Sequence, residues 1–235
     1  MNVEILKDAA AVAARGASSL IEGSRAKPDL VVALPTGRTP IAMYAQLASE
    51  RAAGRLDLKR ATTFNLDEVL LPKERPETFF QFMTRYVWEP LGISSERRFI
   101  PNGSATDPEA ECGRYEAALA AAGGLDLALL GIGADGHIAY NLPGQVRART
   151  HLVELDPATI ATLGPDVRGP LRAITMGTET ILSAKTILLL ATGSSKAEAL
   201  RRMRDDPPGD AWPCTLFRDH PGLTILADGK AAAQL

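Results

Sequence analysis

The chain has 235 residues, of which 46% are hydrophobic and 23% are charged, a composition typical of a soluble globular protein. Its 26 Lys and Arg residues nearly balance its 28 Asp and Glu residues, so the net charge is −2 at pH 7. This balance argues against nucleic acid or an anionic membrane as the main partner, since both bind basic surfaces. The only cysteines, Cys112 and Cys214, show no metal-ligand spacing, which favours reduced thiols in a cytoplasmic protein.

Neither a targeting signal nor a membrane span is predicted. The N-terminal segment, residues 4–22, has acidic residues in an amphipathic pattern, which predicts a helix and no signal peptide. No apolar run approaches the roughly 20 residues that are needed to cross a bilayer.

Apolar, β-branched runs alternate with alanine-rich helical patterns along almost the whole chain. The predicted strands are Leu30–Leu34, Ala61–Leu66, Leu125–Leu130, Ala173–Met176, Thr186–Ala191 and Leu223–Ala227. The predicted helices lie near 4–22, 40–54, 77–88, 108–122, 178–184 and 195–204. Continuous apolar strands are typical of a parallel sheet that is covered on both faces. We therefore predict an α/β fold with helices on both sides of the sheet, in a single domain over residues 1–235.

Ligands of open α/β sheets bind where strands end and helices begin. After the first predicted strand come Thr36, Gly37, Arg38 and Thr39, followed by a proline that suits the first turn of a helix, with Thr39 as its cap. Glycine, hydroxyl groups, a guanidinium and a helix N-terminus together favour phosphate binding. A plain strand-to-helix turn explains the same residues equally well.

Two acidic residues follow the second of these strands. Because successive side chains alternate along a strand, Asp67 and Glu68 are expected to point to different sides. A carboxylate at the end of a strand, next to a phosphate-binding loop, is well placed as a general base. Judged alone, a solvated acidic turn is the simpler interpretation.

The loop from Gly131 to Asn141 contains Asp135 and His137 among several glycines. Such a loop can hold an imidazole and a carboxylate close together, and an imidazole can exchange a proton with a sugar ring oxygen near neutral pH. A histidine with only a structural role is the alternative, and it is our interpretation of His151 and His220.

Lys196 opens another predicted helix after the run of residues 186–191. Ser195 and Glu198 have the spacing of a capping box, and Lys196 offers a second positive charge for the same phosphate. A capped surface helix with a solvated lysine is the alternative.

Together, these segments resemble the glucosamine-6-phosphate deaminase family. They occur in the family's order over nearly the whole chain and read LPTGRTP, FNLDE, ETFFQFM, AECGRYE, GIGADGHIAYNLPG, ARTHLVELDPAT, AITMGTETILSAKTILLLATGSSKAEAL and a final DH. The related 6-phosphogluconolactonases share the fold and the DGH signature, whereas FNLDE with DGHIAYN is more similar to the deaminases.

The resemblance implies a three-layer, Rossmann-like α/β domain with a mostly parallel central sheet and helices on both faces. It also implies ring opening, aldose-to-ketose isomerisation and loss of ammonia, which convert glucosamine 6-phosphate to fructose 6-phosphate. Carried over by position, Asp67 matches the base that moves the C2 proton, His137 the ring-opening acid/base and Asp135 its acidic partner.

The resemblance also implies the rest of the site. Thr36, Gly37, Arg38 and Thr39 match the family's phosphate loop, and Lys196 matches its phosphate-binding lysine. No metal or organic cofactor is implied. The expected partner is a small sugar phosphate in the cytoplasm, with no nucleic acid or membrane, and a homo-oligomer is left open.

Two positions depart from the family pattern. Leu142 stands where family deaminases have a glutamate that supports the catalytic histidine, so His137 should lose basicity unless Asp135 or another acid replaces that glutamate. The stretch that carries a phosphate-binding arginine in the family is shortened here, and Arg168 or Arg172 is the candidate replacement, with Arg172 closer to the lactonase arrangement.

Two alternatives to a deaminase remain open. The first is a sugar-phosphate lactonase in which His137 activates water, since lactone hydrolysis needs no C2 base. The second is a sugar-phosphate-binding protein that binds its ligand without turnover.

Overall fold

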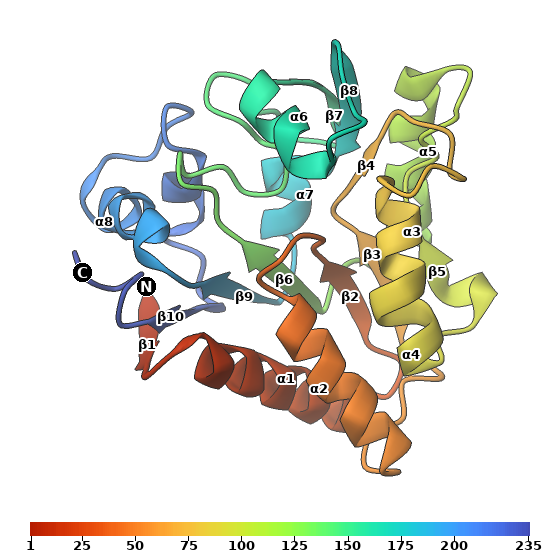
Figure 1. Cartoon of the computed structure of the whole chain (residues 1–235). Coiled ribbons are helices and arrows are strands. Elements are labelled where there is room, and N and C mark those ends of the chain that lie inside the picture. The colour runs from red at the N-terminus through yellow and green to blue at the C-terminus, as the bar shows by residue number, and fades with distance from the viewer.

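The computed structural model describes residues 1–235, and a seven-stranded sheet in the order β1-β10-β9-β6-β2-β3-β5 runs through its centre (Figure 1). Every adjacent pair in this sheet is parallel. The strands are β1 (Asn2–Leu6), β2 (Val31–Leu34), β3 (Thr62–Asn65), β5 (Arg98–Phe99), β6 (Leu127–Gly131), β9 (Thr186–Ala191) and β10 (Leu223–Asp228).

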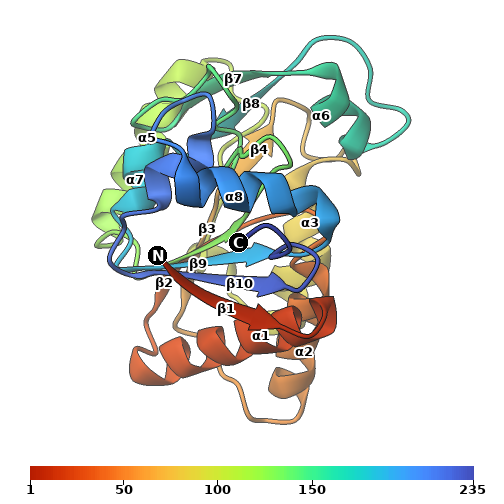
Figure 2. The same ribbon diagram turned by 90° about the vertical axis from the view of Figure 1, so that its left-hand side faces the viewer.

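Helices cover both faces of this sheet, as predicted (Figure 2). The elements of one face are α1 (Ala9–Ala26), α2 (Ile41–Ala52), α3 (Phe79–Met83), the π-helical turn η1 (Thr84–Trp88) and α4 (Glu89–Leu91). Those of the other face are α5 (Pro108–Ala121), α7 (Thr178–Leu182), α8 (Ala197–Asp205) and the 3-10 turn η4 (Pro213–Phe217). Two further 3-10 turns are η2 (Ser95–Arg97) and η3 (Ser194–Lys196).

The side chains of the central strands alternate between two apolar cores. In β2, Val31 and Ala33 pack in the core with α5 and α8, whereas Val32 and Leu34 pack in the core with α1 and α2. All four are buried, which is why the strand reads as one continuous apolar run rather than an alternating one. The predicted three-layer architecture is confirmed.

A second, antiparallel sheet was not predicted. Its strands, in the order β4-β8-β7, are β4 (Asp67–Val69), β8 (Leu171–Thr175) and β7 (His151–Leu155), with α6 (Pro157–Leu163) packed against them. The strand predicted at Ala173–Met176 overlaps β8, so it belongs to this sheet and not to the parallel one. Because β4 begins two residues after β3 ends, the small sheet lies beside the carboxyl edge of the large one (Figure 1).

The helix predicted over 4–22 is wrong at its start. Residues 2–6 form β1, which pairs with β10 in parallel register, Asn2 with Thr224. Helix α1 begins only at Ala9, where the side chain of Asp8 caps it by accepting a 2.8 Å hydrogen bond from the Ala11 N–H.

The remaining expectations about the chain as a whole concern membranes and cysteines. None of the helices is both long and apolar enough to span a bilayer. Cys112 and Cys214 are buried, and both thiols are free.

Candidate active site

The predicted loops lie at one edge of the parallel sheet. Neighbouring strands β9, β6, β2 and β3 all end there, so the loops that follow them come together. The charged side chains on these segments affect one another's pKa. Burial lowers the pKa of Lys196, the charge of Arg38 lowers it further and that of Asp135 raises it. The charge of His137 likewise acts on Asp67. The side chains of Arg38, Asp67, Asp135, His137 and Lys196 therefore lie at the same edge of the sheet.

Asp67 is a buried carboxylate, only 7% exposed, at the start of β4. Its Oδ1 accepts a 3.0 Å hydrogen bond from the Tyr140 N–H and a 2.5 Å hydrogen bond from the Thr175 hydroxyl. Burial raises the pKa of Asp67 to about 6, although these two hydrogen bonds and the charge of His137 act to lower it. A carboxylate with a pKa close to neutrality is suited to taking up and returning a proton.

Glu68 points to the other side of the strand, as alternation predicts. Its carboxylate accepts hydrogen bonds from the N–H groups of Val69, Phe79 and Phe80, at 2.8 to 2.9 Å. Burial raises the pKa of Glu68 to about 7, although these three hydrogen bonds oppose the shift. Glu68 thus fastens the start of α3 to β4 and leaves the face of Asp67 clear, a supporting role that the sequence did not suggest.

His137 and Asp135 form a close pair in the glycine-rich loop after β6. Nδ1 of His137 lies 2.7 Å from Oδ1 of Asp135, and both side chains are partly exposed. Burial raises the pKa of Asp135, but its contact with His137 outweighs this and brings the pKa below its usual value. The contact with Asp135 is made through Nδ1, so Nε2 is the ring nitrogen that is available for proton transfer.

Gly133 provides the space that this pair occupies. A Cβ at Gly133 would overlap Nδ1 of His137 and Oδ1 of Asp135, although the backbone at Gly133 does not itself require glycine. We therefore expect Gly133→Ala to separate the pair and to lower kcat by at least about tenfold, because small displacements of catalytic groups cost large factors in rate. Turnover assays on the purified variant, with its thermal melt, measure this.

Gly131→Ala is the matched control, because nothing lies within 4 Å of the position where its Cβ would be. It should keep kcat close to that of the wild type. Equal rates in both variants would show that the close approach at Gly133 has no catalytic consequence.

The rings of the other two histidines contact main-chain groups, as expected for a structural role. The ring nitrogens of His151 lie 3.0 Å from Arg149 O and 3.2 Å from Gln145 O. Those of His220 contact Ala184 O and the Gly222 N–H at 3.0 and 3.1 Å.

The predicted phosphate loop spans Thr36 to Thr39 between β2 and α2. Gly37 has φ +98°, a left-handed conformation that favours glycine, and the Tyr44 hydroxyl anchors the loop by donating to Pro35 O at 2.7 Å. The cap predicted at Thr39 is wrong, because α2 begins at Ile41 with no side-chain cap. Helix α2 therefore starts beside the loop without a side-chain cap, and a helix N-terminus in this position suits an anion.

Lys196 ends the 3-10 turn η3 and directly precedes α8. The predicted capping box at Ser195 is also wrong, because α8 begins at Ala197 with no side-chain cap. Glu198 instead forms ion pairs with Arg201 and Arg202, at 2.7 and 2.8 Å.

Arg172 and Leu142 lie in different surroundings. Arg172 is three residues before Thr175 on β8, so its side chain lies on the opposite face of the strand from the side of Thr175 that contacts Asp67. There it lines a pocket of about 530 Å³ together with Glu154. Its role in phosphate binding stays a prediction. Leu142 is 3% exposed and packs in the apolar cluster of the small sheet, so this position contributes no polar group to the site.

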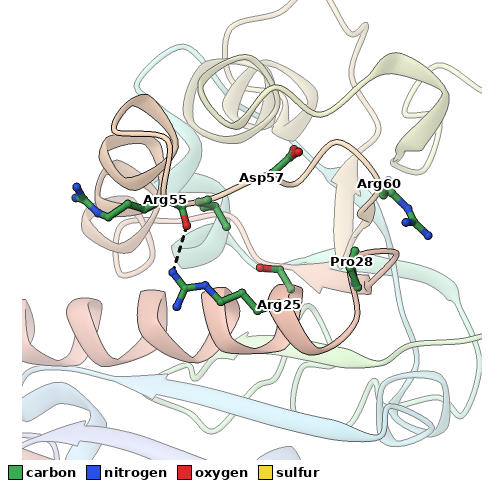
Figure 3. A pocket seen from close by; sticks show the side chains of 7 residues that line it. Arg25, Pro28, Arg55, Asp57 and Arg60 are labelled. Atoms are coloured by element: carbon green, nitrogen blue, oxygen red, sulfur yellow. Dashed lines mark hydrogen bonds between the residues drawn. The ribbon is translucent and has the colours of Figure 1, made fainter.

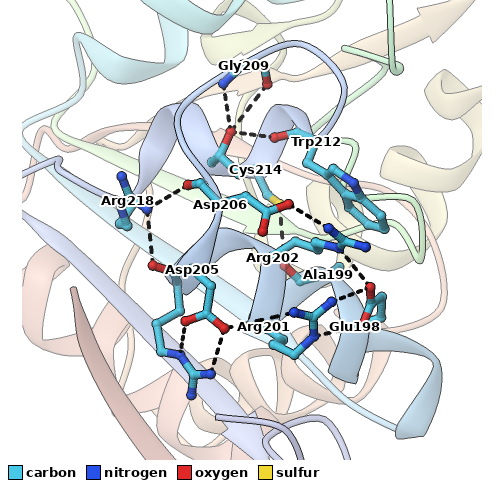
Figure 4. Close-up of polar contacts among 12 residues, drawn as sticks. Glu198, Ala199, Arg201, Arg202, Asp205, Asp206, Gly209, Trp212, Cys214 and Arg218 are labelled. Atoms are coloured by element: carbon cyan, nitrogen blue, oxygen red, sulfur yellow. Dashed lines mark hydrogen bonds and ion pairs between the residues drawn. The ribbon is translucent and has the colours of Figure 1, made fainter.

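The segment after α8 packs against the loop of residues 131–141, which carries Asp135 and His137. The Cys214 N–H donates to Gly136 O at 2.8 Å, and a Cβ at Gly136 would overlap the Trp212 ring. On the other side, the guanidinium of Arg202 on α8 lies 5.3 Å from the Trp212 ring centroid and also bonds the carboxylates of Glu198 on α8 and Asp206 directly after it (Figure 4). His137 therefore lies on a loop that is braced against α8.

A cavity of about 270 Å³ lies at the opposite edge of the sheet (Figure 3). It is lined by Ser24, Arg25, Pro28, Arg55, Leu56, Asp57 and Arg60. These residues precede β2 and β3, and none belongs to the predicted site. The side chains of Arg55 and Arg60 point away from one another, and Arg25 bonds the backbone oxygen of Arg55 at 3.3 Å.

The chain is similar in sequence to proteins of a known family. Residues 6–226 match the family model described as glucosamine-6-phosphate isomerases/6-phosphogluconolactonase. A glucosamine-6-phosphate deaminase of Cellvibrio japonicus is 40% identical, over 100% of this chain and 92% of the relative. One of Rhodopirellula baltica is 41% identical, over 100% of this chain and 96% of the relative.

Solved structures of this family are also similar to the chain. A monomeric glucosamine-6-phosphate deaminase matches with a TM-score of 0.95 and 36% identity, over 100% of both chains. A 6-phosphogluconolactonase from Trypanosoma cruzi shares the fold, with a TM-score of 0.81, 20% identity and coverage of 100% of this chain and 96% of that one. The chain therefore belongs to the glucosamine-6-phosphate isomerase/6-phosphogluconolactonase family.

Proposed function

We propose that this chain is a glucosamine-6-phosphate deaminase, which converts glucosamine 6-phosphate and water to fructose 6-phosphate and ammonia. The observation that carries the proposal is the buried carboxylate of Asp67, with a pKa of about 6, within electrostatic range of the His137–Asp135 pair. The full-length similarity to deaminases supports the same reaction.

Two proton-transfer groups divide the reaction between them. His137, paired with Asp135, takes the proton of the C1 hydroxyl and delivers a proton to the ring oxygen, so that the bond between C1 and the ring oxygen breaks and the open-chain aldehyde forms. Asp67 then removes the proton from C2 and returns it at C1, which turns the aldose into a ketose derivative whose C2 nitrogen leaves as ammonia after water adds. Each step needs only a proton donor or acceptor at a fixed position.

A cationic and amide-rich edge holds the phosphate in this proposal. Lys196 and Arg38 supply the charge, and residues 36–39 with the start of α2 supply hydroxyl and N–H donors. Anchoring the phosphate fixes the distance of the sugar ring from His137 and Asp67, which reduces the entropic cost of reaching the transition state.

A parallel assay tests the proposal. Purified protein should release ammonia from glucosamine 6-phosphate, and galactosamine 6-phosphate and 6-phosphogluconolactone are the comparison substrates. Ammonia release from neither amino sugar would refute the proposal. Tight binding of glucosamine 6-phosphate without turnover would instead identify a binding protein.

Leu142 favours the second candidate function, hydrolysis of a sugar-phosphate lactone. Because this side chain is apolar and buried, His137 has only Asp135 as an acidic partner, an arrangement that suffices for activating water against an ester carbonyl. Release of acid from 6-phosphogluconolactone without ammonia from the amino sugars would establish this alternative.

The acid limb of the pH profile should report on Asp67. The base accepts a proton only when ionised, and its pKa is about 6, so kcat/KM should be near its plateau above that pH and fall as the pH drops through it. Well below the pKa, the decrease should approach about tenfold for each pH unit. Initial rates of ammonia release between pH 4.5 and 8, in buffers of constant ionic strength, measure it. A flat profile down to pH 5 would contradict the assignment of Asp67 as the base.

A further inference from the structure

The hydroxyl group of Thr175 joins three separate segments at Asp67. It donates to Oδ1 of Asp67 at 2.5 Å and accepts from the Tyr140 N–H at 3.0 Å. The same N–H also lies 3.0 Å from Oδ1 of Asp67. Because all three residues are buried, this triangle is shielded from water.

Only one of the two carboxylate oxygens of Asp67 takes part in this triangle. Both hydrogen bonds that the carboxylate accepts go to Oδ1, and Oδ2 accepts none from the protein. The anchored oxygen is occupied by donors, so the other oxygen is the one that is available to accept a proton from substrate. An anchor on one oxygen also stops rotation of the carboxylate, which would otherwise move its basic lone pair away from the substrate.

The fold builds this anchor from two local features. In the antiparallel ladder of the small sheet, Asp67 lies directly opposite Thr175, which places the hydroxyl beside the carboxylate. In the turn of residues 138–141, at the end of the loop that carries His137, Ala139 has φ +53°, an unusual conformation for a residue with a side chain. This turn directs the next N–H, that of Tyr140, at both partners.

We propose that Thr175 is a positioning residue of this enzyme, whose hydroxyl holds Oδ1 of Asp67 so that Oδ2 is presented to the C2 proton of the substrate. The inference rests on the proposed function for the identity of the substrate proton. Thr175 itself does not touch the substrate; it acts through Asp67.

Other titratable groups also act on Asp67 and must stay constant in a test. His137 and Tyr140 lie in the loop of residues 131–141, and Glu68 lies on β4. Tyr115 on α5 lies close by, where its hydroxyl donates to Asn65 O at 2.7 Å. Substitution of Thr175 alters none of these groups. A change in the titration of Asp67 therefore reports on the lost hydroxyl.

The test compares Thr175→Val, which has nearly the same shape without the hydroxyl, with Thr175→Ser, which keeps it. The carboxyl carbon of Asp67 is followed by NMR titration of protein labelled at aspartate, with Asp67→Asn to assign the signal. Loss of a hydrogen bond to the ionised form should raise the pKa of Asp67 from about 6 to about 7 in the valine variant. The serine variant should titrate like the wild type.

Kinetics of the same variants provide the second readout. In Thr175→Val, the acid limb of kcat/KM for glucosamine 6-phosphate should move up with the pKa and the plateau of kcat should fall, while KM changes little. Thr175→Ser should restore both. If the valine variant does not fold, Thr175→Ala takes its place.

The outcomes separate the inference from the proposed function. An unchanged pKa of Asp67 in the folded variant without the hydroxyl would overturn the role of Thr175, whatever the enzyme's substrate. A raised pKa in a protein whose wild type releases no ammonia would support the anchor and refute the deaminase proposal.

Discussion

Replacing Asp67 with asparagine should lower the rate of ammonia release by roughly 10²–10⁴-fold, the usual contribution of a general base. The amide cannot accept the C2 proton, although its oxygen can still accept the hydrogen bonds of Thr175 and the Tyr140 N–H. Ammonia release in steady state and exchange of the C2 hydrogen in heavy water should both be lost. Retained exchange would show that another group is the base.

Stability should not account for this loss. Burial raises the pKa of Asp67 to about 6 from a usual value of about 3.9, so the folded protein binds this proton more tightly than the unfolded chain does. The carboxyl therefore contributes stability below about pH 4, and this contribution disappears as the pH rises through 6. At neutral pH the neutral amide avoids the burial of a charge, and the melting temperature of Asp67→Asn should equal or exceed that of the wild type.

Replacing His137 with glutamine should also lower ammonia release by about 10²–10⁴-fold, because glutamine can bond Asp135 but cannot exchange a proton near neutral pH. Initial rates at saturating glucosamine 6-phosphate measure this, with ligand binding followed separately by calorimetry. Binding should be weakened far less than turnover, because the phosphate contacts that we propose for Lys196 and Arg38 do not involve His137.

His220→Gln is the matched control for this substitution. The ring of His220 contacts only main-chain groups near Ala184 and Gly222, so its replacement should lower stability and leave kcat close to that of the wild type. Equal losses of kcat at both histidines would contradict a specific role for His137 in ring opening.

The parts of the site that follow from local pattern were predictable. The strands that end beside the site, such as Thr186–Ala191, are continuous apolar runs because both of their faces are covered. Parallel strands end at a common edge, so the loops that follow them had to meet there. Alternation also correctly separated Asp67, which faces the site, from Glu68, which caps α3.

Predictions from local sequence pattern were wrong where contacts with distant residues decide the backbone conformation. Residues 2–6 have an amphipathic pattern that a short helix also satisfies, and they form a strand because β10 offers an unpaired edge 222 residues further along the chain. The caps expected at Thr39 and Ser195 have favourable spacing, but each helix begins one residue later than the spacing implies. The backbone conformation of each loop is decided by its tertiary contacts.

Residue types and their order along the chain were therefore enough to indicate the α/β class, and they predicted the sheet edge, the imidazole, the carboxylates and the lysine of the proposed site. Tertiary structure alone decided which oxygen of Asp67 is free, because its anchor is a threonine 108 residues away on a strand of the second sheet. The same holds for the burial of Leu142 among apolar side chains. Both depend on packing between segments that are remote in sequence, and no local periodicity records such contacts.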